Sequence, residues 1–550
     1  MEKLIKRNEQ LTENTWAVND LFKSDEDWDT AYKNASTLAD EIGLFAGKIS
    51  GSAKILYDYV IFREKCAAEI MAIYCYAMLK SDEDKGNSKY LDFFGRAISL
   101  YTVFSGKISF EMPEIISIPD EVLETFYKDE PKLLEFRRFF DMQRSAKAHT
   151  LSQAEESLLA SAGEIAQAPD TISSQFRDAD LKFPDIKDAD GNSIQVTQGN
   201  FVPLMENSDV NIRRQAFESV YHTYDNYKNT VASTLDAQMK LLMFFTKARK
   251  FGSNLERALF ANEVPVSVYE NLVKSVNNHL PSMHKYMALR KRLMGLDEMH
   301  MYDLYTPIVS DADSKITFSE AKEICRKALL PLGENYLKVL DEGFNNRWID
   351  IYENEGKRGG AYSMGTPIHP FVLLNQKDTL DSMFTLIHEM GHALHSYFSK
   401  QNQRETYSEY VIFVAEVAST FNESMLMQHL LLTTTDKKQR AYLINHFLEQ
   451  FRTTLYRQTM FAEFELEISK LAESGHTLTA DALCDSYYKL NQKYYGDSIV
   501  IDKEIAIEWA RIPHFYYNFY VYQYSTGFSA AIALSEKVLS EGGDAVKNYL

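Results

Sequence analysis

The sequence is poor in the residues that interrupt helices. Its 550 residues include only 13 prolines and 23 glycines, fewer than the roughly 5% and 7% that are usual in globular proteins. So few helix breakers over so long a chain predict a mainly α protein. Because one hydrophobic core seldom serves more than about 300 residues, we expect two or more lobes.

Other shortages exclude whole classes of protein. The four cysteines form no CxxC pair, which excludes a dense disulfide framework and a cysteine-rich zinc site. No apolar run approaches the roughly 18 residues of a membrane span, and the N-terminus lacks the apolar core of a secretory signal. The 59 basic against 78 acidic residues give a net charge of −19, which disfavours nucleic acid or an anionic membrane as partner. We therefore expect a cytoplasmic protein.

Helical periodicity extends over residues 1–185, with helices expected at 42–62 and 64–79. Residues 186–205 differ, because a cluster of turn residues precedes short apolar runs that predict a hairpin or linker. Residues 206–550 form the third predicted segment and are again mainly helical. We expect capping boxes to begin two of the helices, at Ser152–Glu155 and at Thr317–Glu320.

Glycines and prolines gather in residues 348–375. Two short apolar runs there, 361–364 and 371–374, are typical of strands. They predict a small β-sheet immediately before a long helix.

That helix carries an H-E-x-x-H motif, residues 388–392. Residues four apart on a helix lie only about 40° apart around its axis and about 6 Å apart along it, so His388 and His392 can bind one zinc ion. Glu389 then lies beside the metal, where it can take a proton from a zinc-bound water. The alternative is a surface helix that carries two histidines by chance.

A catalytic zinc usually has three protein ligands, and Glu416 is the best third candidate. It is the one acid within the apolar run 410–420, and a buried carboxylate is costly unless a cation or hydrogen bonds compensate it. The alternative is pairing with an Arg or Lys from elsewhere. Glu409 and Glu423 share its helix face and are rival candidates. Glu409 lies in a polar stretch, where solvation explains it, and Glu423 could accept a hydrogen bond from a ligand histidine. We expect His395 to be packed or to support the site without binding the metal.

Aromatic residues dominate the segment from 514 to 528. On a helix, Tyr517, Tyr520 and Tyr524 would share one face with His514 beside them, opposite a second aromatic face of Phe515, Phe519 and Tyr522. Phenol and imidazole donors facing a zinc site would stabilise the oxyanion of peptide hydrolysis. Taken alone, such a stripe is more typical of core packing.

Together these motifs resemble oligoendopeptidase F, a relative of the thimet oligopeptidases. The resemblance is carried by residues 388–392, by Glu-Val-Ala-Ser-Thr-Phe-Asn-Glu at 416–423, and by His-Phe-Tyr-Tyr-Asn-Phe-Tyr-Val-Tyr-Gln-Tyr at 514–524. It implies a two-lobed helical shell around a deep substrate channel, with a small β-sheet beside the active-site helix. It also implies that residues 206–550 are the catalytic domain.

The resemblance assigns a role to individual residues. It implies one Zn²⁺ per chain held by His388, His392 and Glu416, with Glu389 as the catalytic base. It further implies that donors to the transition state are His514, Tyr520 and Tyr524. The sequence departs from thimet-type relatives in carrying Gly527 where they have a further tyrosine. Family members also usually continue past the point where this chain stops, at Leu550, so truncation is an open alternative.

We therefore expect a zinc endopeptidase that hydrolyses short peptides. The strand near Gly359 and Gly360 would let an extended peptide pair with it through backbone hydrogen bonds. Two alternatives stay open. One is a helical zinc carboxypeptidase that trims peptide C-termini, and the other is a non-catalytic peptide-binding shell with a structural zinc.

Overall fold

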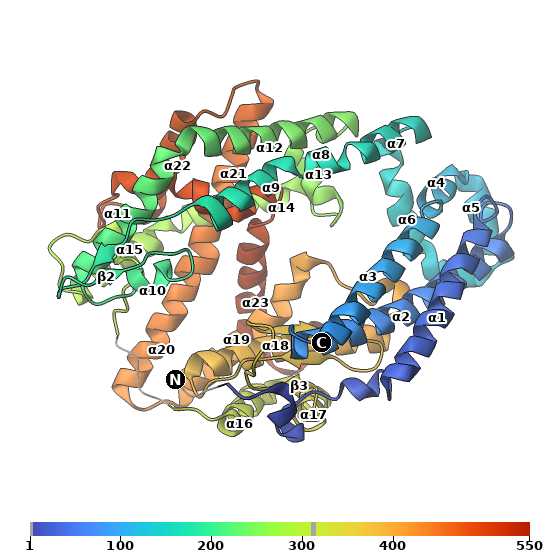
Figure 1. Ribbon diagram of the computed structural model, residues 1–550, viewed down its shortest axis with the longest axis horizontal. Coiled ribbons are helices and arrows are strands. Elements are labelled where there is room, and N and C mark those ends of the chain that lie inside the picture. The colour runs from blue at the N-terminus through green and yellow to red at the C-terminus, as the bar shows by residue number, and fades with distance from the viewer. Residues whose placement is uncertain (1–3, 310–314) are drawn as a thin grey trace. The chain divides into compact units, whose positions relative to one another are not determined.

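The computed structural model describes residues 4–309 and 315–550, and helices make up most of them (Figure 1). Strands in this part of the chain are only two or three residues long. The mainly α fold class predicted from the low proline and glycine content is therefore confirmed. Among the described residues, we find no helix with the length and apolar character that crossing a lipid bilayer requires.

Contacts within the chain divide it into two compact units. Unit 1 consists of Met1–Ala148, Asp313–Thr433 and Ala530–Leu550, and unit 2 of His149–Ala312 and Thr434–Ser529. Each unit is thus built from segments that are far apart in the sequence. The predicted segments 1–185, 186–205 and 206–550 follow the chain linearly instead, and as domain boundaries they remain predictions.

Unit 1 contains most of the N-terminal helices, the helix that carries the H-E-x-x-H motif and the helix that carries Glu416. Its helices are α1 (Asp25–Ile42), α2 (Ala53–Glu83), α3 (Ser88–Lys107), α4 (Glu111–Ser117), α5 (Asp120–Asp129), α6 (Arg137–Ser145), α16 (Phe318–Ala328), α17 (Glu334–Asn345), α18 (Leu380–Asn402), α19 (Ile412–Thr433) and α24 (Gly543–Tyr549). The helix α23 (Tyr522–Glu541) has residues in both units.

The first three helices pack around Trp28 in α1. Its buried indole donates a hydrogen bond to the carbonyl of Ile73 in α2 at 2.9 Å. The ring also stacks on Phe93 of α3, with centroids 4.1 Å apart. These contacts bury a large aromatic surface and satisfy its one polar atom, which fixes the three helices as one packed layer.

The prediction of two separate helices in this region is wrong, both in their number and in where the first begins. The two helices expected at 42–62 and 64–79 are the single helix α2, which begins only at Ala53. The hydroxyl of Ser52 caps α2 by accepting the backbone N–H of Ile55. Ahead of it, Gly47 has a φ of +77°, a left-handed conformation that ends any continuous helix from Ile42.

A three-stranded sheet precedes α18, as the sequence predicted. It consists of β3 (Ile349–Asp350), β4 (Tyr362–Met364) and β5 (Phe371–Leu373), in the order β3-β5-β4. The central strand β5 is parallel to β3 and antiparallel to β4. Both β4 and β5 contact α18, so the small sheet does lie beside the helix of the motif.

Unit 2 is a second helical assembly with one hairpin. Its helices are α7 (Gln153–Ser161), α8 (Gly163–Ala166), α9 (Ala168–Gln175), α10 (Phe201–Met205), α11 (Val210–Asn226), α12 (Lys228–Ala248), α13 (Asn254–Phe260), α14 (Val266–Asn278), α15 (Leu280–Leu293), α20 (Lys437–Gln450), α21 (Arg457–Glu473) and α22 (Ala480–Tyr495). The strands β1 (Ile186–Lys187) and β2 (Ser193–Ile194) form the predicted hairpin.

Local sequence signals explain several of these elements. The carboxylate of Asp188 accepts the backbone N–H groups of Asp190 and Asn192, which closes the hairpin turn. Both predicted capping boxes are present, at the start of α7 and at the start of α16. In each, a hydroxyl and a glutamate exchange hydrogen bonds with the first backbone N–H groups, as the capping mechanism requires.

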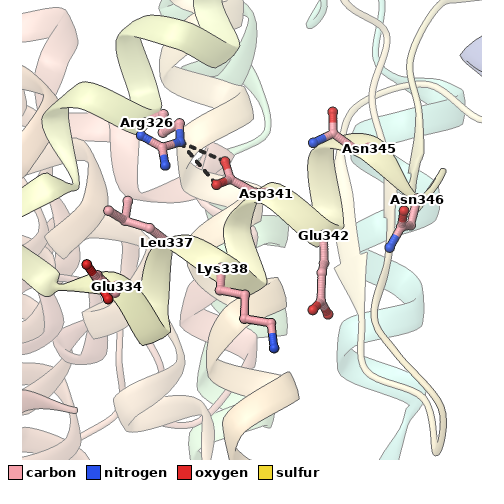
Figure 2. A pocket seen from close by; sticks show the side chains of 8 residues that line it. All are labelled: Arg326, Glu334, Leu337, Lys338, Asp341, Glu342, Asn345 and Asn346. Carbon is pink, nitrogen blue, oxygen red and sulfur yellow. Dashed lines mark hydrogen bonds and ion pairs between the residues drawn. The ribbon is translucent and has the colours of Figure 1, made fainter.

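A surface pocket of about 550 Å³ lies along α16 and α17 of unit 1 (Figure 2). Within it, Nε of Arg326 donates to the carboxylate of Asp341 at 2.8 Å. The pocket is lined by Arg326, Glu334, Leu337, Lys338, Asp341, Glu342, Asn345 and Asn346. Because charges of both signs line it, the pocket favours no particular class of ligand.

Candidate metal centre

The H-E-x-x-H motif lies in the middle of α18, as expected. The helix begins where the hydroxyl of Thr379 accepts the backbone N–H of Ser382. Apolar side chains such as Ile387 and Leu394 are fully buried and hold the helix in the core of unit 1. The helix is thereby fixed in rotation, and the two histidines lie on a partly exposed face.

Three potential metal ligands converge at this face. Nε2 of His388 lies 3.4 Å, and Nε2 of His392 3.6 Å, from Oε2 of Glu416 in α19. All three ligand atoms lie within 4.8 Å of one another. Tetrahedral ligands about 2.0–2.1 Å from a zinc ion would be roughly 3.4 Å apart. The donor set and its spacing therefore fit a zinc ion held by three ligands from the described residues.

Among the described residues, no lysine or arginine compensates the charge of Glu416. In the described part of the chain, its ion pairs are with the two histidines alone, and no Arg or Lys pairs with it. The hydroxyl of Ser419 donates to Oε2 of Glu416 at 2.9 Å. A carboxylate held by a hydroxyl and two imidazoles is suited to a cation rather than to a structural salt bridge.

The other acids and the third histidine behave as the sequence suggested. Nδ1 of His388 donates to Oε1 of Glu423, which leaves Nε2 free to bind a metal. Glu409 is exposed and pairs with Lys400 at 2.8 Å. His395 stacks on the ring of Tyr410, with centroids 3.7 Å apart, and does not belong to the cluster of potential ligands.

Glu389 is buried, with 7% of its surface exposed. Burial, together with the negative charges of Glu416 and Glu423, raises the pKa of its carboxyl to about 7, although the nearby His388 opposes this shift. A carboxyl that titrates near neutrality can both accept and return a proton, which is what a general base of hydrolysis must do.

Three small residues that sequence reasoning missed, Gly391, Ala418 and Ser419, bring α18 and α19 together. A Cβ built on Gly391 would lie 2.6 Å from Cα of Ser419 and 2.8 Å from the carbonyl oxygen of Ala418. Because these are backbone atoms, only a glycine permits this approach. The sequence signal was available: a glycine in the middle of a helix, and the small pair Ala418 and Ser419 on the next one.

The aromatic segment of unit 2 is folded differently from the prediction. Residues 514–524 are not one helix, because Asn518 and Phe519 have φ values of +53° and +57°. A short 3₁₀ turn (Pro513–Tyr516) precedes them and α23 follows. The expected grouping is nevertheless present, with the ring of Tyr520 lying 5.9 Å from that of His514 and 5.5 Å from that of Tyr524.

Comparison with known proteins identifies the family. A family model described as Peptidase family M3 matches residues 203–549, and one described as Oligopeptidase F matches residues 114–183. Oligopeptidase PepF of Bacillus subtilis (strain 168) is 46% identical over 545 residues, which are 99% of this chain and 81% of that relative. The chain belongs to peptidase family M3.

Further relatives of this M3 chain are also described as oligopeptidases or oligoendopeptidases. Group B oligopeptidase PepB of Streptococcus agalactiae is 40% identical over 97% of this chain and 90% of its own length. The crystal structure of oligoendopeptidase-F from Enterococcus faecium is 39% identical, with a TM-score of 0.72, over 96% of this chain and 90% of that one. The resemblance to oligoendopeptidase F is therefore confirmed, and the family makes the chain a metallo-endopeptidase.

Proposed function

We propose that this M3 peptidase is a zinc-dependent endopeptidase that cleaves internal bonds of short peptides in the cytoplasm. The observation that carries the proposal is the convergence of His388, His392 and Glu416, with no described lysine or arginine paired with the carboxylate. Bound there, Zn²⁺ would supply a Lewis acid and lower the pKa of a coordinated water toward 7.

Glu389 is the proposed general base. It follows His388 directly in α18 and is not one of the three potential ligands, so its carboxyl would lie beside the metal rather than bind it. It would take the proton from the attacking water and return it to the leaving amine of the cleaved peptide. Burial raises the pKa of its carboxyl, which suits a group that must both take and return a proton.

His514, Tyr520 and Tyr524 are the proposed donors to the oxyanion of the transition state. Their rings form one cluster in unit 2, and all three side chains are only partly buried. The cluster therefore presents an imidazole and phenol groups to solvent, as an oxyanion site requires. The family resemblance supports their choice over the more exposed Tyr517.

The edge of β4 is the proposed binding site for the peptide backbone. In the described sheet β4 has a partner on one side only, and a Cβ built on Gly359 or Gly360 would meet no atom within 4 Å. An extended peptide could pair with this open edge through main-chain hydrogen bonds, which tolerate many side chains. If a bulky residue at Gly360 left peptide turnover unchanged, this binding mode would be wrong.

Metal analysis combined with product analysis tests the whole proposal. We expect about one zinc per chain, and cleavage of a doubly blocked, quenched fluorescent peptide that a chelator stops and zinc restores. Mass spectrometry of the products should show internal cleavage. Release of single C-terminal residues from unblocked peptides alone would favour a carboxypeptidase, and firmly bound zinc without cleavage would favour a structural metal.

A further inference from the structure

A buried carboxyl in unit 2 lies outside the proposed chemistry and accepts one described hydrogen bond. Glu465 in α21 is fully buried. Its Oε1 accepts the backbone N–H of Phe519 at 2.6 Å. Its Oε2 has no hydrogen-bond partner among the described residues, and burial raises the pKa of the carboxyl. So costly a group in a core calls for a purpose beyond packing.

The backbone that Glu465 holds is unusual. Asn518 and Phe519 are consecutive non-glycine residues with positive φ, a conformation that persists only where the surroundings impose it. The ring of Phe519 is buried and packs edge-on against Tyr269 of α14, with centroids 5.6 Å apart. The reversal thus turns Phe519 inward and leaves Tyr517 and Tyr520 outward.

A second buried group fixes the other side of the same loop. Nε2 of Gln238 in α12 donates to the carbonyl of Tyr516 at 3.0 Å. Phe515, next to it, is buried between Phe461 and Phe464 of α21. The loop is therefore held by two polar contacts to its backbone, one before the reversal and one within it.

We propose that Glu465 is a positioning residue for turnover, whose carboxyl holds the reversal at Asn518 and Phe519 and so orients the His514 and Tyr520 side chains. This inference rests on the proposed role of those side chains. The hydrogen bond of Glu465 goes to the backbone N–H of Phe519, so it acts through the loop. Any acceptor of the same length at this position preserves the arrangement.

Three substitutions of Glu465 test the inference. Glu465→Leu removes the acceptor, and we expect kcat to fall at least tenfold while KM changes less than threefold. Glu465→Gln keeps an oxygen in place and should stay within threefold of the original kcat. Glu465→Asp withdraws the acceptor by one methylene and should give an intermediate loss, which keeps the test available if the leucine variant does not fold.

Controls separate positioning from general damage. Glu467→Leu, in the same helix, removes the acceptor of the Ser486 hydroxyl and should leave kcat unchanged. All variants should keep the metal content of the original protein, because the ligands lie in unit 1. A tetrahedral phosphinic peptide should lose affinity in Glu465→Leu by the factor lost from kcat/KM, whereas a product peptide should not.

The outcomes distinguish this inference from the proposed function. If Tyr520→Phe and His514→Ala lower kcat but folded Glu465→Leu and Glu465→Asp do not, the positioning role is overturned alone. If Glu465→Gln is as impaired as Glu465→Leu, the acceptor role is also wrong. If Tyr520→Phe and His514→Ala have no effect, the proposed donors fail, and Glu465 is then no positioning residue for them.

Discussion

At the scale of single residues, substitution of Glu389 distinguishes binding of the metal from catalysis of hydrolysis. It is buried beside the ligand cluster but is not part of it. We expect Glu389→Gln to lower kcat at least a hundredfold, because a general base typically contributes about 10²–10⁴ in rate. Zinc content, measured by atomic absorption, should stay at the original level. Residual activity above about a hundredth of the original would contradict the role.

Glu416 and Glu409 make a matched pair of acids on one polypeptide segment. Glu416 faces the two histidines, whereas Glu409 pairs with Lys400 at the surface. Glu416→Ala should lose zinc on dialysis, and Glu409→Ala should keep it, because only the first removes a ligand. Equal metal content in the two variants, determined after the same dialysis, would defeat the assignment of the third ligand.

Glu465 gives a prediction for stability against pH. Burial raises the pKa of its carboxyl from about 4.5 to about 8, so the folded state holds the proton more tightly than the unfolded chain. Its contribution is complete below pH 4.5 and is lost as the pH rises through 8, by up to about 1.4 kcal/mol per pH unit. Urea unfolding at several pH values measures this loss. Between about pH 4.5 and 8, the free energy of unfolding of Glu465→Gln should rise relative to that of the original protein. A constant difference would contradict the raised pKa.

At the scale of elements, the crossing of α18 and α19 decides whether the ligands meet. A Cβ at position 391 would clash with the backbone of Ser419, one helical turn beyond Glu416. Gly391→Ala should therefore separate the helices and weaken zinc affinity about 10–100-fold, the range found when groups that support metal ligands are disturbed. Competition with a fluorescent chelator measures this affinity without any assay of activity.

Gly343 in α17 is the matched control for this crossing. A Cβ there would meet Cε of Met390 at 2.7 Å and the ring of Trp348 at 3.0 Å, which are side-chain atoms and can shift. Gly343→Ala should therefore lower thermal stability more than zinc affinity. Similar losses of zinc affinity in both variants would show that general loosening, and not the close helix crossing, controls the metal site.

At the scale of the whole molecule, the proposed metal would stabilise only one of the two compact units. All three ligands lie in unit 1, and a ligand at 100 times its Kd stabilises the folded state by about 2.7 kcal/mol. Removing zinc should therefore increase hydrogen exchange in α18 and α19, while α21 and α22 of unit 2 keep their protection. Mass spectrometry of peptic fragments measures both. Equal loss of protection in the two units would contradict this localisation.

Several features of the fold were predictable because they depend on neighbours in the sequence. The capping boxes of α7 and α16, the hairpin turn at Asp188 and the small sheet before α18 are all local patterns, and all are present. The start of α2 and the break in the aromatic segment were missed. Both depend on residues with positive φ, and the backbone N–H of Phe519 donates a hydrogen bond to a side chain of another helix.

By itself, the sequence determined that two imidazoles and an acid lie on one helical turn, because the spacing of side chains on a helix is fixed by its regular hydrogen-bonded backbone. It also indicated Glu416, since an acid in an apolar run needs a cation. Only the tertiary structure decided that Gly391 and Ser419 let the two helices meet, and that Glu465 holds the loop of His514 and Tyr520. Such contacts join residues far apart in the chain, and the spacing of apolar residues along the sequence does not predict them.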